Sequence, residues 1–357
     1  MILTRLALSN FRQYIKRNLS LSPKTTVLVG SNAIGKTNLL ESIYLLSYGK
    51  SFHTSDEREM ISFTKEFARV KGEFQEDVTL EVFLTRGEVE KIRTPYKKFT
   101  VNGVGKRLVD FTGNLKVVLF WPLDLDLVTD SPSLRRKYLS NVLVQVDHEY
   151  RRCLLSYERG LRQRNKILEN IREGKASQSQ LPFWNQLLIK TGSYITQKRR
   201  QYIDFVNTFH PPHEAFQGMR YRLVYDTSVI SDDRLAKYKD AEIASGVTLV
   251  GPHRDDVIIE ITLKEASNSF KNLSHFGSRG EQRLGVLFIK IAELQFIQEQ
   301  TGVTPLFLLD DILSELDHKH RQIIFEMTKN QQTIMTTTDL HFIDKKHLSR
   351  VELVSLP

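Results

Sequence analysis

Residues 30–37 carry the residue types and the spacing of a phosphate-binding loop, G-x-x-x-x-G-K-T. The glycines let backbone N–H groups curl around a phosphate, because no Cβ obstructs the approach. Lys36 is placed to reach the outer phosphates of a nucleotide, and the Thr37 hydroxyl to ligate Mg²⁺. An apolar run precedes the loop, and an amphipathic helical pattern with Leu39 and Ile43 on one face follows it. The motif therefore stands in the context that it requires.

Two carboxylates follow an apolar run nearer the other end of the chain. Residues 305–309 read Pro-Leu-Phe-Leu-Leu, and Asp310 and Asp311 come directly after them. A buried strand ending here would place Asp310 beside a magnesium ion, and Asp311 would orient or deprotonate an attacking water. An apolar strand that ends in Asp is common by itself, so the pairing with the phosphate-binding loop is what favours a metal site.

Residues 276–282, Phe-Gly-Ser-Arg-Gly-Glu-Gln, open another helical pattern. The Ser278 hydroxyl, bare backbone N–H groups at Gly280 and the positive end of the helix would together form a second anion site. Taken alone, this turn is more simply a capped helix start. A chain with one phosphate-binding loop has little use for a second, so we expect the turn to cap the γ-phosphate of a nucleotide held by another copy of the chain.

The chain has 357 residues, of which 40% are hydrophobic and 26% charged. This composition suits two or three globular domains and excludes collagen-like, low-complexity and disulfide-rich classes. No apolar run approaches the ~20 residues that span a bilayer, so we expect no membrane helix and no membrane partner. The N-terminus lacks a secretory signal pattern, and the single cysteine, Cys153, cannot form an intrachain disulfide. We therefore expect a cytoplasmic protein.

The formal net charge is +9, and most of the excess is local. Residues 150–205 hold twelve Lys or Arg against four Asp or Glu, a local excess of eight. Such a concentrated positive field favours a polyanion, because each neutralised phosphate releases counterions. The charge pattern alone fits a solvated helical face equally well. If the partner is DNA, the arginines expected to contact it are Arg162, Arg164, Arg199 and Arg200.

Hydrophobic patterns divide the chain into an α/β domain and an inserted lobe. The α/β domain is expected from residues 1–131 and 213–357, and the basic, mainly helical lobe from residues 132–212. The elements expected are strands around residues 2–8, 25–29, 78–84, from 221 and at 257–261, and helices over 135–172, 183–209 and from 279 onward.

Residues 251–256, Gly-Pro-His-Arg-Asp-Asp, gather titratable groups in a turn. A Gly-Pro turn with an internal Arg–Asp pair explains them structurally. The alternative is that His253 acts as a base or metal ligand, although no second histidine at metal spacing supports it. Four aromatic residues interleave with the basic helices and are expected in the core rather than as base-stacking platforms: Tyr138, Tyr150, Tyr157 and Trp184.

These motifs, in this order, resemble an ABC-type P-loop ATPase head of the SMC-like kind. More specifically, the chain resembles the RecF family of bacterial recombination mediators over nearly its full length. The stretches that carry this resemblance are residues 8–14 (LSNFRQY), 131–136 (SPSLRR), 251–256 (GPHRDD) and 309–317 (LDDILSELD).

The resemblance implies roles for individual residues. Residues 278–282 correspond to the signature motif that engages ATP across a dimer interface, residues 314–317 to the D-loop, and Asp310 to the Walker B carboxylate. Asp311 stands where many such ATPases have a catalytic glutamate, and no switch histidine is evident at residues 336–339, which together imply slow hydrolysis. The residues implied in ATP binding are Gly30, Ser31, Asn32, Ala33, Ile34, Gly35, Lys36, Thr37, Asn38, Arg12, Ser278, Gly280 and Gln282; those in catalysis are Asp311, Asp310 and Lys36, and those in Mg²⁺ binding are Thr37 and Asp310.

The family further implies a weak, DNA-stimulated ATPase that forms an ATP-dependent homodimer on duplex DNA near single-strand gaps. It implies RecR and RecO as partners and assistance to RecA loading during DNA repair, replication, recombination and the SOS response. Three rival classes fit less well. A transporter ATPase subunit would not need Lys36 and Ser278 to lie 242 residues apart, an SMC head would need long arms, and a nuclease would need a second acidic cluster.

Overall fold

In the computed structural model, which describes residues 1–211, 213–262 and 269–356, the chain forms two compact units. Unit 1 consists of Met1–Asp126, His213–Ala215 and Ile289–Pro357, and unit 2 of Leu127–Pro212 and Phe216–Phe288. Unit 1 confirms the prediction of an α/β head formed from both ends of the chain. The expected boundaries differ from these units, because residues 216–288 pack with the inserted helices. Residues 212 and 357, two of the expected boundaries, lie outside the described residues.

Unit 1 contains an antiparallel sheet of six strands in the order β2-β1-β4-β5-β8-β9. Buried and more exposed residues alternate along β4 and β5, so one face of the sheet belongs to the core. The strands are β1 (Leu3–Phe11), β2 (Tyr14–Ser20), β4 (Phe67–Phe74), β5 (Thr79–Thr85), β8 (Lys97–Val101) and β9 (Val104–Lys106).

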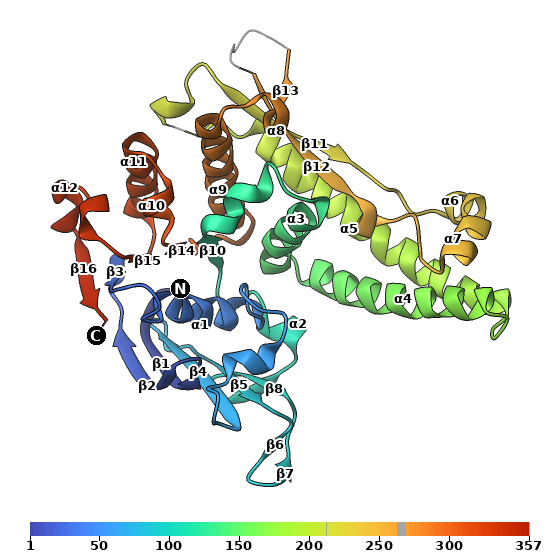
Figure 1. The fold of residues 1–357 in the computed structure, drawn as a ribbon, viewed down its shortest axis with the longest axis horizontal. Coiled ribbons are helices and arrows are strands. Elements are labelled where there is room, and N and C mark those ends of the chain that lie inside the picture. Colours follow the sequence, from blue (N-terminus) through green and yellow to red (C-terminus); the bar gives the residue numbers. More distant parts are fainter. Residues whose placement is uncertain (212, 263–268, 357) are drawn as a thin grey trace. The chain divides into compact units, whose positions relative to one another are not determined.

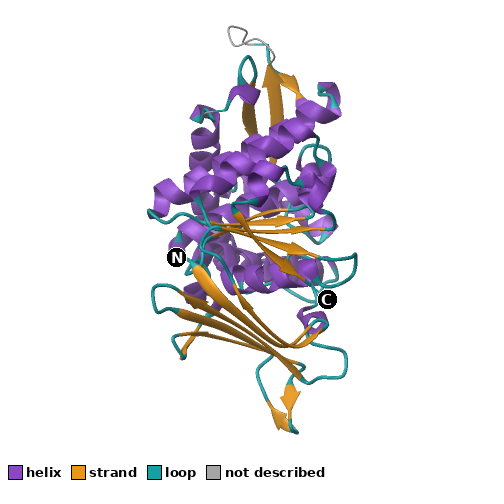
Figure 2. Ribbon diagram, turned by 90° about the vertical axis from the view of Figure 1, so that its left-hand side faces the viewer, coloured by secondary structure: helices purple, strands orange, loops and turns teal. Residues whose placement is uncertain are grey.

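The second sheet of unit 1 is parallel, with the order β10-β14-β15-β3-β16. Its strands are β3 (Thr25–Val29), β10 (Val117–Phe120), β14 (Leu306–Asp310), β15 (Thr333–Thr337) and β16 (Val351–Ser355). Every residue of β14 and β15 is buried, as expected for central parallel strands. The strands, orange in Figure 2, form separate sheets rather than one layer. Because β3 and β14 are parallel, the residues that follow them, 30–37 and Asp311, meet at one edge.

Helix α1 (Lys36–Tyr48) packs against strands of both sheets of unit 1 (Figure 1). It contacts β1, β4 and β5 of the antiparallel sheet and β10, β14 and β15 of the parallel sheet. Eleven of its 13 residues are buried, including Glu41 and Ser42. The prediction of an amphipathic helix is therefore wrong, because a helix covered on two sides has no solvent face.

Unit 2 is built on two long helices, α4 (His148–Arg172) and α5 (Leu181–Thr208), which lie side by side (Figure 1). The sequence predicts one helix over residues 135–172, but the structure has α3 (Pro132–Val146) before α4. The break falls at Asp147, whose side chain accepts a hydrogen bond from the Tyr150 N–H at 2.8 Å. This N-cap starts a new helix in a pattern that otherwise runs on.

A three-stranded sheet, β11-β12-β13, completes unit 2 and confirms the strands expected from residue 221 and at 257–261. β11 (Arg220–Asp226) contacts α5, and β12 (Asp256–Thr262) contacts α3. β13 (Lys271–Asn272) precedes the predicted helix, α9 (Arg279–Thr301), which passes from unit 2 into unit 1 at Ile289.

The remaining elements are short. They are β6 (Glu88–Val89), β7 (Ile92–Arg93), α2 (Leu108–Phe111), α6 (Asp232–Lys237), α7 (Lys239–Ser245), α8 (Leu273–Phe276), α10 (Ile312–Glu315), α11 (His318–Met327) and α12 (Lys345–Leu348), with 3₁₀ turns at Glu57–Met60, Pro122–Leu127, Gln178–Gln180, Glu214–Phe216, Pro252–Arg254, Thr328–Asn330 and Leu340–Phe342. Among the described residues, no helix combines the length and the apolar character needed to cross a membrane.

Candidate nucleotide-binding site

The loop between β3 and α1 is shaped around the Lys36 ammonium. Lys36 Nζ donates to the backbone oxygens of Gly30 at 2.7 Å and Ser31 at 2.8 Å. Gly35 has a φ of +94°, and a Cβ there would collide with the Gln13 side chain, so only glycine fits. Partial burial lowers the pKa of Lys36, an effect that the carboxylates of Asp311 and Asp310 oppose. The loop thus holds a cation among backbone dipoles at the start of a helix, as phosphate binding requires.

The other residues of the loop keep their backbone accessible. Ser31, Asn32 and Ala33 are exposed, while Ile34, Thr37 and Asn38 are half-buried. Ala33 adopts a φ of +64°, which curls the chain tightly at this point. The structure therefore brings the predicted residues 30–38 together as one continuous cradle.

Asp310 lies directly beside Thr37, as the sequence predicts for a metal site. The Thr37 Oγ1 hydroxyl donates to Asp310 Oδ1 at 3.0 Å, although 273 residues separate the two. A third residue, Thr336, donates to the same oxygen at 2.9 Å. It does so because β14 and β15 pair Asp310 with Thr336. Sequence reasoning missed this threonine, whose one signal was its position at the end of an apolar strand.

Asp311 is held beside Thr336 in an unusual backbone conformation. Its φ of +48° lies in the left-handed region, and its N–H donates to Thr336 Oγ1 at 2.9 Å. Within the described residues, Asp311 Oδ1 is buried and accepts no hydrogen bond. Burial raises the pKa of Asp311, while Lys36 lowers it and Asp310 raises it again. Such an unpaired acceptor is suited to a water or a ligand donor.

Thr37 and Asp310 fit a magnesium ion in chemistry, since both offer hard oxygen ligands. Among the described residues, no group of three or more His, Cys, Asp or Glu side chains could hold a metal by itself. A Mg²⁺ at Thr37 and Asp310 would therefore take its other ligands from phosphates and water, which is how this ion is commonly bound in nucleotide sites.

Arg12, expected near the nucleotide, is held by a buried carboxylate. Its Nε and Nη2 donate to the two oxygens of Glu41, each at 2.7 Å, and its Nη1 donates to the Glu59 backbone oxygen at 2.9 Å. Glu41 is 1% exposed and also accepts from the Ser51 hydroxyl. Spacing along the chain does not indicate this bidentate pair, because Glu41 lies inside an ordinary helical pattern. A direct contact of Arg12 with a nucleotide stays a prediction.

A second buried cluster in unit 1 also escaped sequence reasoning. Lys290 Nζ lies 3.3 Å from Asp124 Oδ2 and 3.2 Å from Glu293 Oε2, and all three side chains are largely buried. Burial raises the pKa of Glu293 to about 7, against the pull of Lys290. Asp124 lies in the 3₁₀ turn Pro122–Leu127, and its partners lie on α9, which starts far downstream. One cation thus serves two carboxylates in the core of unit 1.

The turn at Ser278 belongs to unit 2 and starts helix α9 as a capping box. The Ser278 N–H and hydroxyl donate to Glu281 Oε2 at 2.7 and 2.8 Å. Gln282 Nε2 approaches the backbone oxygens of Leu273 and Gly277, both at 3.3 Å. Ser278 and Gly280 are exposed. The simpler interpretation, a capped helix start, is confirmed, and the contact with a second copy stays a prediction.

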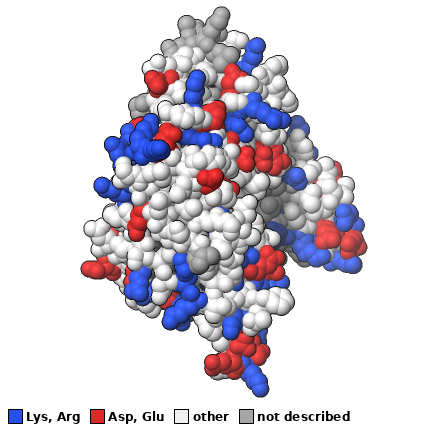
Figure 3. All heavy atoms as spheres, turned by 60° about the vertical axis from the view of Figure 1, so that its left-hand side comes forward, with Lys and Arg blue, Asp and Glu red and all other residues white. Residues whose placement is uncertain are grey.

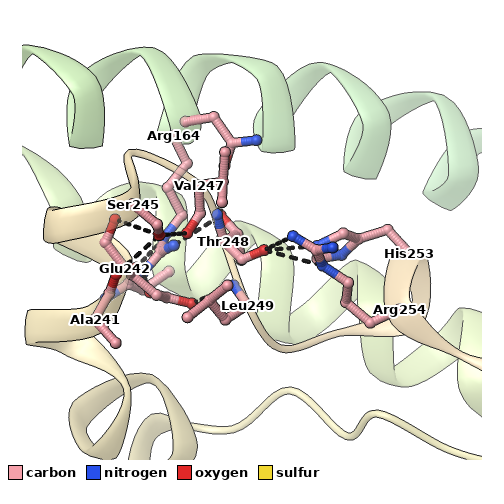
Figure 4. A network of polar contacts seen from close by, with 11 residues as sticks. Arg164, Ala241, Glu242, Ser245, Val247, Thr248, Leu249, His253 and Arg254 are labelled. Carbon is pink, nitrogen blue, oxygen red and sulfur yellow. Dashed lines mark hydrogen bonds and ion pairs between the residues drawn. The ribbon is translucent and has the colours of Figure 1, made fainter.

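Two of the four arginines expected on DNA are buried in unit 2, and for these the prediction is wrong. Arg164 is 2% exposed, with Nη2 at 2.6 Å from Glu242 and Nη1 at 2.8 Å from Thr248 Oγ1 (Figure 4). Arg199 donates to Asp255 at 3.0 Å and to the Pro252 oxygen at 2.6 Å. Both guanidinium groups are held by internal acceptors, so neither can reach a phosphate.

Arg162 and Arg200 are exposed and remain candidates for DNA contact. On the face drawn in Figure 3, Lys and Arg side chains form several groups with Asp and Glu among them, not one continuous band. Part of the local excess of basic residues therefore lies in buried ion pairs. The exposed surface of unit 2 is less basic than the count of charged residues in the sequence predicts.

His253 has a structural role in the same polar core (Figure 4). Its Nε2 lies 3.0 Å from the Thr248 backbone oxygen, and its Nδ1 lies 2.7 Å from the Tyr157 hydroxyl. A carbonyl only accepts, so Nε2 carries the proton and Nδ1 accepts from the tyrosine. Burial lowers the pKa of His253 to about 4, which keeps the ring neutral. The turn expected at residues 251–256 is confirmed, since the Arg254 N–H donates to the Gly251 oxygen at 2.9 Å. The internal Arg–Asp pair is wrong: Arg254 donates to the Thr248 oxygen, and Asp255 and Asp256 pair with Arg199 and Arg135 from other elements.

The parallel sheet with a phosphate-binding loop after β3 and a carboxylate pair after β14 defines an ABC-type P-loop ATPase head. The family model described as RecF/RecN/SMC N terminal domain matches residues 2–354. This chain belongs to the RecF family of DNA replication and repair proteins.

Two relatives illustrate the likeness. The chain is 36% identical to the DNA replication and repair protein RecF of Herpetosiphon aurantiacus, covering 98% of this chain and 97% of the relative. It is 34% identical to RecF of Ligilactobacillus salivarius, covering 99% and 95%. The solved structure of the recombination mediator protein RecF-ATPrS in the RecFOR pathway is similar with a TM-score of 0.85 at 28% identity, covering 96% of this chain and 94% of that chain.

Proposed function

We propose that this chain binds Mg·ATP in residues 30–38 and uses it to dimerise on DNA during repair. The observation that carries the proposal is the 3.0 Å contact between Thr37 and Asp310 beside the Lys36 ammonium. These three residue types, brought together from two parallel strands, match what a nucleotide triphosphate with its metal needs. ATP in solved RecF structures of 28% identity supports the choice of nucleotide.

Each residue of the site has a distinct task. Backbone N–H groups of residues 30–37 and the start of α1 bind the phosphates, and Lys36 moves from the loop carbonyls to the outer phosphates. Thr37 and Asp310 would hold Mg²⁺, which would neutralise charge on the phosphates. Asp311 orients the attacking water and accepts its proton through the oxygen that has no donor. An aspartate is shorter than the glutamate usual in the wider class, so hydrolysis is slow.

Dimerisation uses the exposed turn at Ser278. In this proposal Ser278, Gly280 and the start of α9 in one copy cap the γ-phosphate held by residues 30–37 of the other copy. Because those contacts exist only in the dimer, ATP shifts the population toward it and hydrolysis releases it. Two nucleotides are then enclosed between two chains.

DNA and protein partners complete the proposal. The family's role in DNA replication and repair, and the RecFOR pathway of the solved relative, favour duplex DNA near single-strand gaps and the partners RecR and RecO. The chain would assist RecA loading there, including during the SOS response, and DNA would stimulate its weak ATPase. Arg162 and Arg200 are exposed cations available for the phosphate backbone.

Sedimentation velocity with ATP, ADP or no nucleotide, each with and without gapped duplex, tests this proposal. Wild type should dimerise only with Mg·ATP, and Lys36→Met should lose both nucleotide binding and dimerisation. Ser278→Arg should bind ATP yet stay monomeric, whereas Ser193→Arg, at an exposed serine of α5, should behave as wild type. A wild-type chain that stays monomeric in saturating Mg·ATP with duplex present would overturn the proposed function.

A further inference from the structure

Phe63 presents its ring to solvent from a turn that is fixed at both ends. Its side chain is 96% exposed. The Ser62 N–H donates to the Asn10 oxygen at 2.8 Å, the Lys65 N–H closes the turn on the Ser62 oxygen at 2.9 Å, and Arg86 Nε donates to the Lys65 oxygen at 3.0 Å. Moving an apolar ring out of water is favourable, because it lowers the free energy of the system. A rigid turn that keeps such a ring in water is suited to a ligand that covers it.

The ring borders a cleft that adjoins the phosphate-binding loop. This cleft, of about 670 Å³, is lined by Phe63, Arg12, Gln13, Asn38, Arg58 and Arg86, among others. Two of these residues connect it to the loop: the Gln13 amide donates to the Ile34 oxygen, and Asn38 follows Thr37 in α1. The described lining includes neither Asp310 nor Asp311. The cleft therefore leads away from the end where the terminal phosphate would lie.

We propose that Phe63 forms a stacking platform for the base of the bound nucleoside triphosphate. The inference rests on the proposed ATP-binding function. If the phosphates occupy residues 30–37 with the terminal phosphate at Asp310 and Asp311, the nucleoside extends from the other end of the cradle, past Asn38. A flat aromatic ring offers its face to any base, and a purine covers more of it than a pyrimidine does.

Two guanidinium groups of the cleft are oriented by protein partners, Arg58 in an exposed ion pair and Arg86 on a backbone oxygen. Arg58 pairs with Asp56 at 2.7 Å, and Arg86 is bound to the backbone of the Phe63 turn. Planar cations beside an aromatic ring add attraction for a base. The phosphate-binding loop would then supply affinity for any triphosphate, and Phe63 would supply the part of the affinity that depends on the base.

Titration calorimetry with two probes, Mg·ATP and inorganic tripolyphosphate with Mg²⁺, separates these contributions. Wild type should bind ATP more tightly than tripolyphosphate. Phe63→Ala should lower ATP affinity about tenfold, the scale of one aromatic–base stack, and leave tripolyphosphate affinity unchanged. Phe63→Trp should retain ATP affinity. Phe183→Ala, at a phenylalanine of unit 2 that is 67% exposed, serves as the matched control and should change neither affinity.

Each other outcome decides against the inference. If Phe63→Ala changes both affinities equally, or neither, the ring does not contact the base while the proposed function stands. If it weakens dimerisation but leaves both affinities unchanged, its partner is a second copy of the chain. If wild type binds neither probe, the proposed function fails and this inference fails with it.

Discussion

Two regions of the molecule bury charged side chains, and they treat them in opposite ways. In the polar core of unit 2, Arg164 pairs with Glu242 at 2.6 Å and Arg199 with Asp255 at 3.0 Å, with each of these side chains at most 4% exposed. At the nucleotide edge of unit 1, Lys36 donates to backbone oxygens, and no ion pair joins it to Asp310 or Asp311 among the described residues.

The difference separates structure from function. A buried charge that is paired inside the fold has no capacity left for a ligand. Removing either partner would destabilise the fold, because the other charge would stay buried and unpaired. Lys36, Asp310 and Asp311 lie close enough to influence one another's pKa but form no ion pair among the described residues, so they keep that capacity for a ligand. Charge density along the sequence does not distinguish a structural charge from one that is available to a ligand. Whether the charge has an ion-pair partner in the fold does distinguish them.

The largest effect is expected from breaking a pair in unit 2. Arg164→Met should lower the free energy of unfolding by about 3–5 kcal/mol, because it leaves the buried Glu242 carboxylate without its partner. Arg162→Met, at an exposed site on the same helix, should change it by less than about 0.5 kcal/mol. Urea unfolding measures both. A stable Arg164→Met variant with weakened DNA binding would restore the sequence-based prediction.

The next effect concerns Glu293, a buried carboxylate that unit 1 pairs only in part. Its pKa rises from 4.5 to about 7 on folding, so the folded state binds a proton that the unfolded state has released between these values. Glu293 therefore contributes on the order of 3 kcal/mol to the free energy of unfolding below about pH 4.5, and this contribution is lost as pH rises to 7. Relative to Glu293→Gln, wild type should lose stability over this range.

Thermal unfolding at pH 5, 6 and 7 measures this difference. Glu299→Gln, exposed on the same helix, should follow wild type. Parallel curves for wild type and Glu293→Gln would show that Lys290 holds the carboxylate charged throughout, and unit 1 would then resemble unit 2.

Removing the unpaired acceptor at the nucleotide edge should affect turnover and not stability. Asp311→Asn is expected to lower the ATP hydrolysis rate about 10²-fold, since the amide cannot accept the proton of water. Its free energy of unfolding should not fall, because no donor to Asp311 Oδ1 is lost. Phosphate-release assays and urea unfolding test the two parts. Glu352→Gln, exposed in β16, is the control. A loss of stability without a loss of turnover would assign Asp311 to the structural class.

The smallest effect is expected at the exposed arginines of unit 2. Arg162→Gln together with Arg200→Gln should reduce the slope of log affinity against log salt by about 2, one phosphate contact each. Arg107→Gln, 80% exposed in unit 1, is the control and should leave the slope unchanged. Fluorescence anisotropy with gapped duplex at several salt concentrations measures it. An unchanged slope in the double variant would place DNA contacts elsewhere.

The parts of the site that the sequence predicted are those whose chemistry is local. Residues 30–38 form one turn and one helix start, and Asp310 follows its own strand, so spacing along the chain sufficed. Glu41 and Thr336 act on partners that the fold supplies from other elements, and nothing in their own neighbourhoods marked them. Glu293 lies one turn from Lys290 on its own helix, but the sequence does not show that Asp124, from another element, shares that cation. The same holds for the break at Asp147, which a continuous helical pattern concealed.

By itself, the sequence determined a phosphate-binding loop, a carboxylate pair, a capped turn at Ser278 and an α/β head assembled from both ends of the chain. Only the tertiary structure decided which charges are available. It buried Arg164 and Arg199, left Arg162 and Arg200 exposed, and gave one oxygen of Asp311 no donor among the residues that it describes. The reason is physical, since hydrogen bonding along helices and turns is set by nearby residues, whereas burial and ion pairing depend on atoms that distant segments bring together.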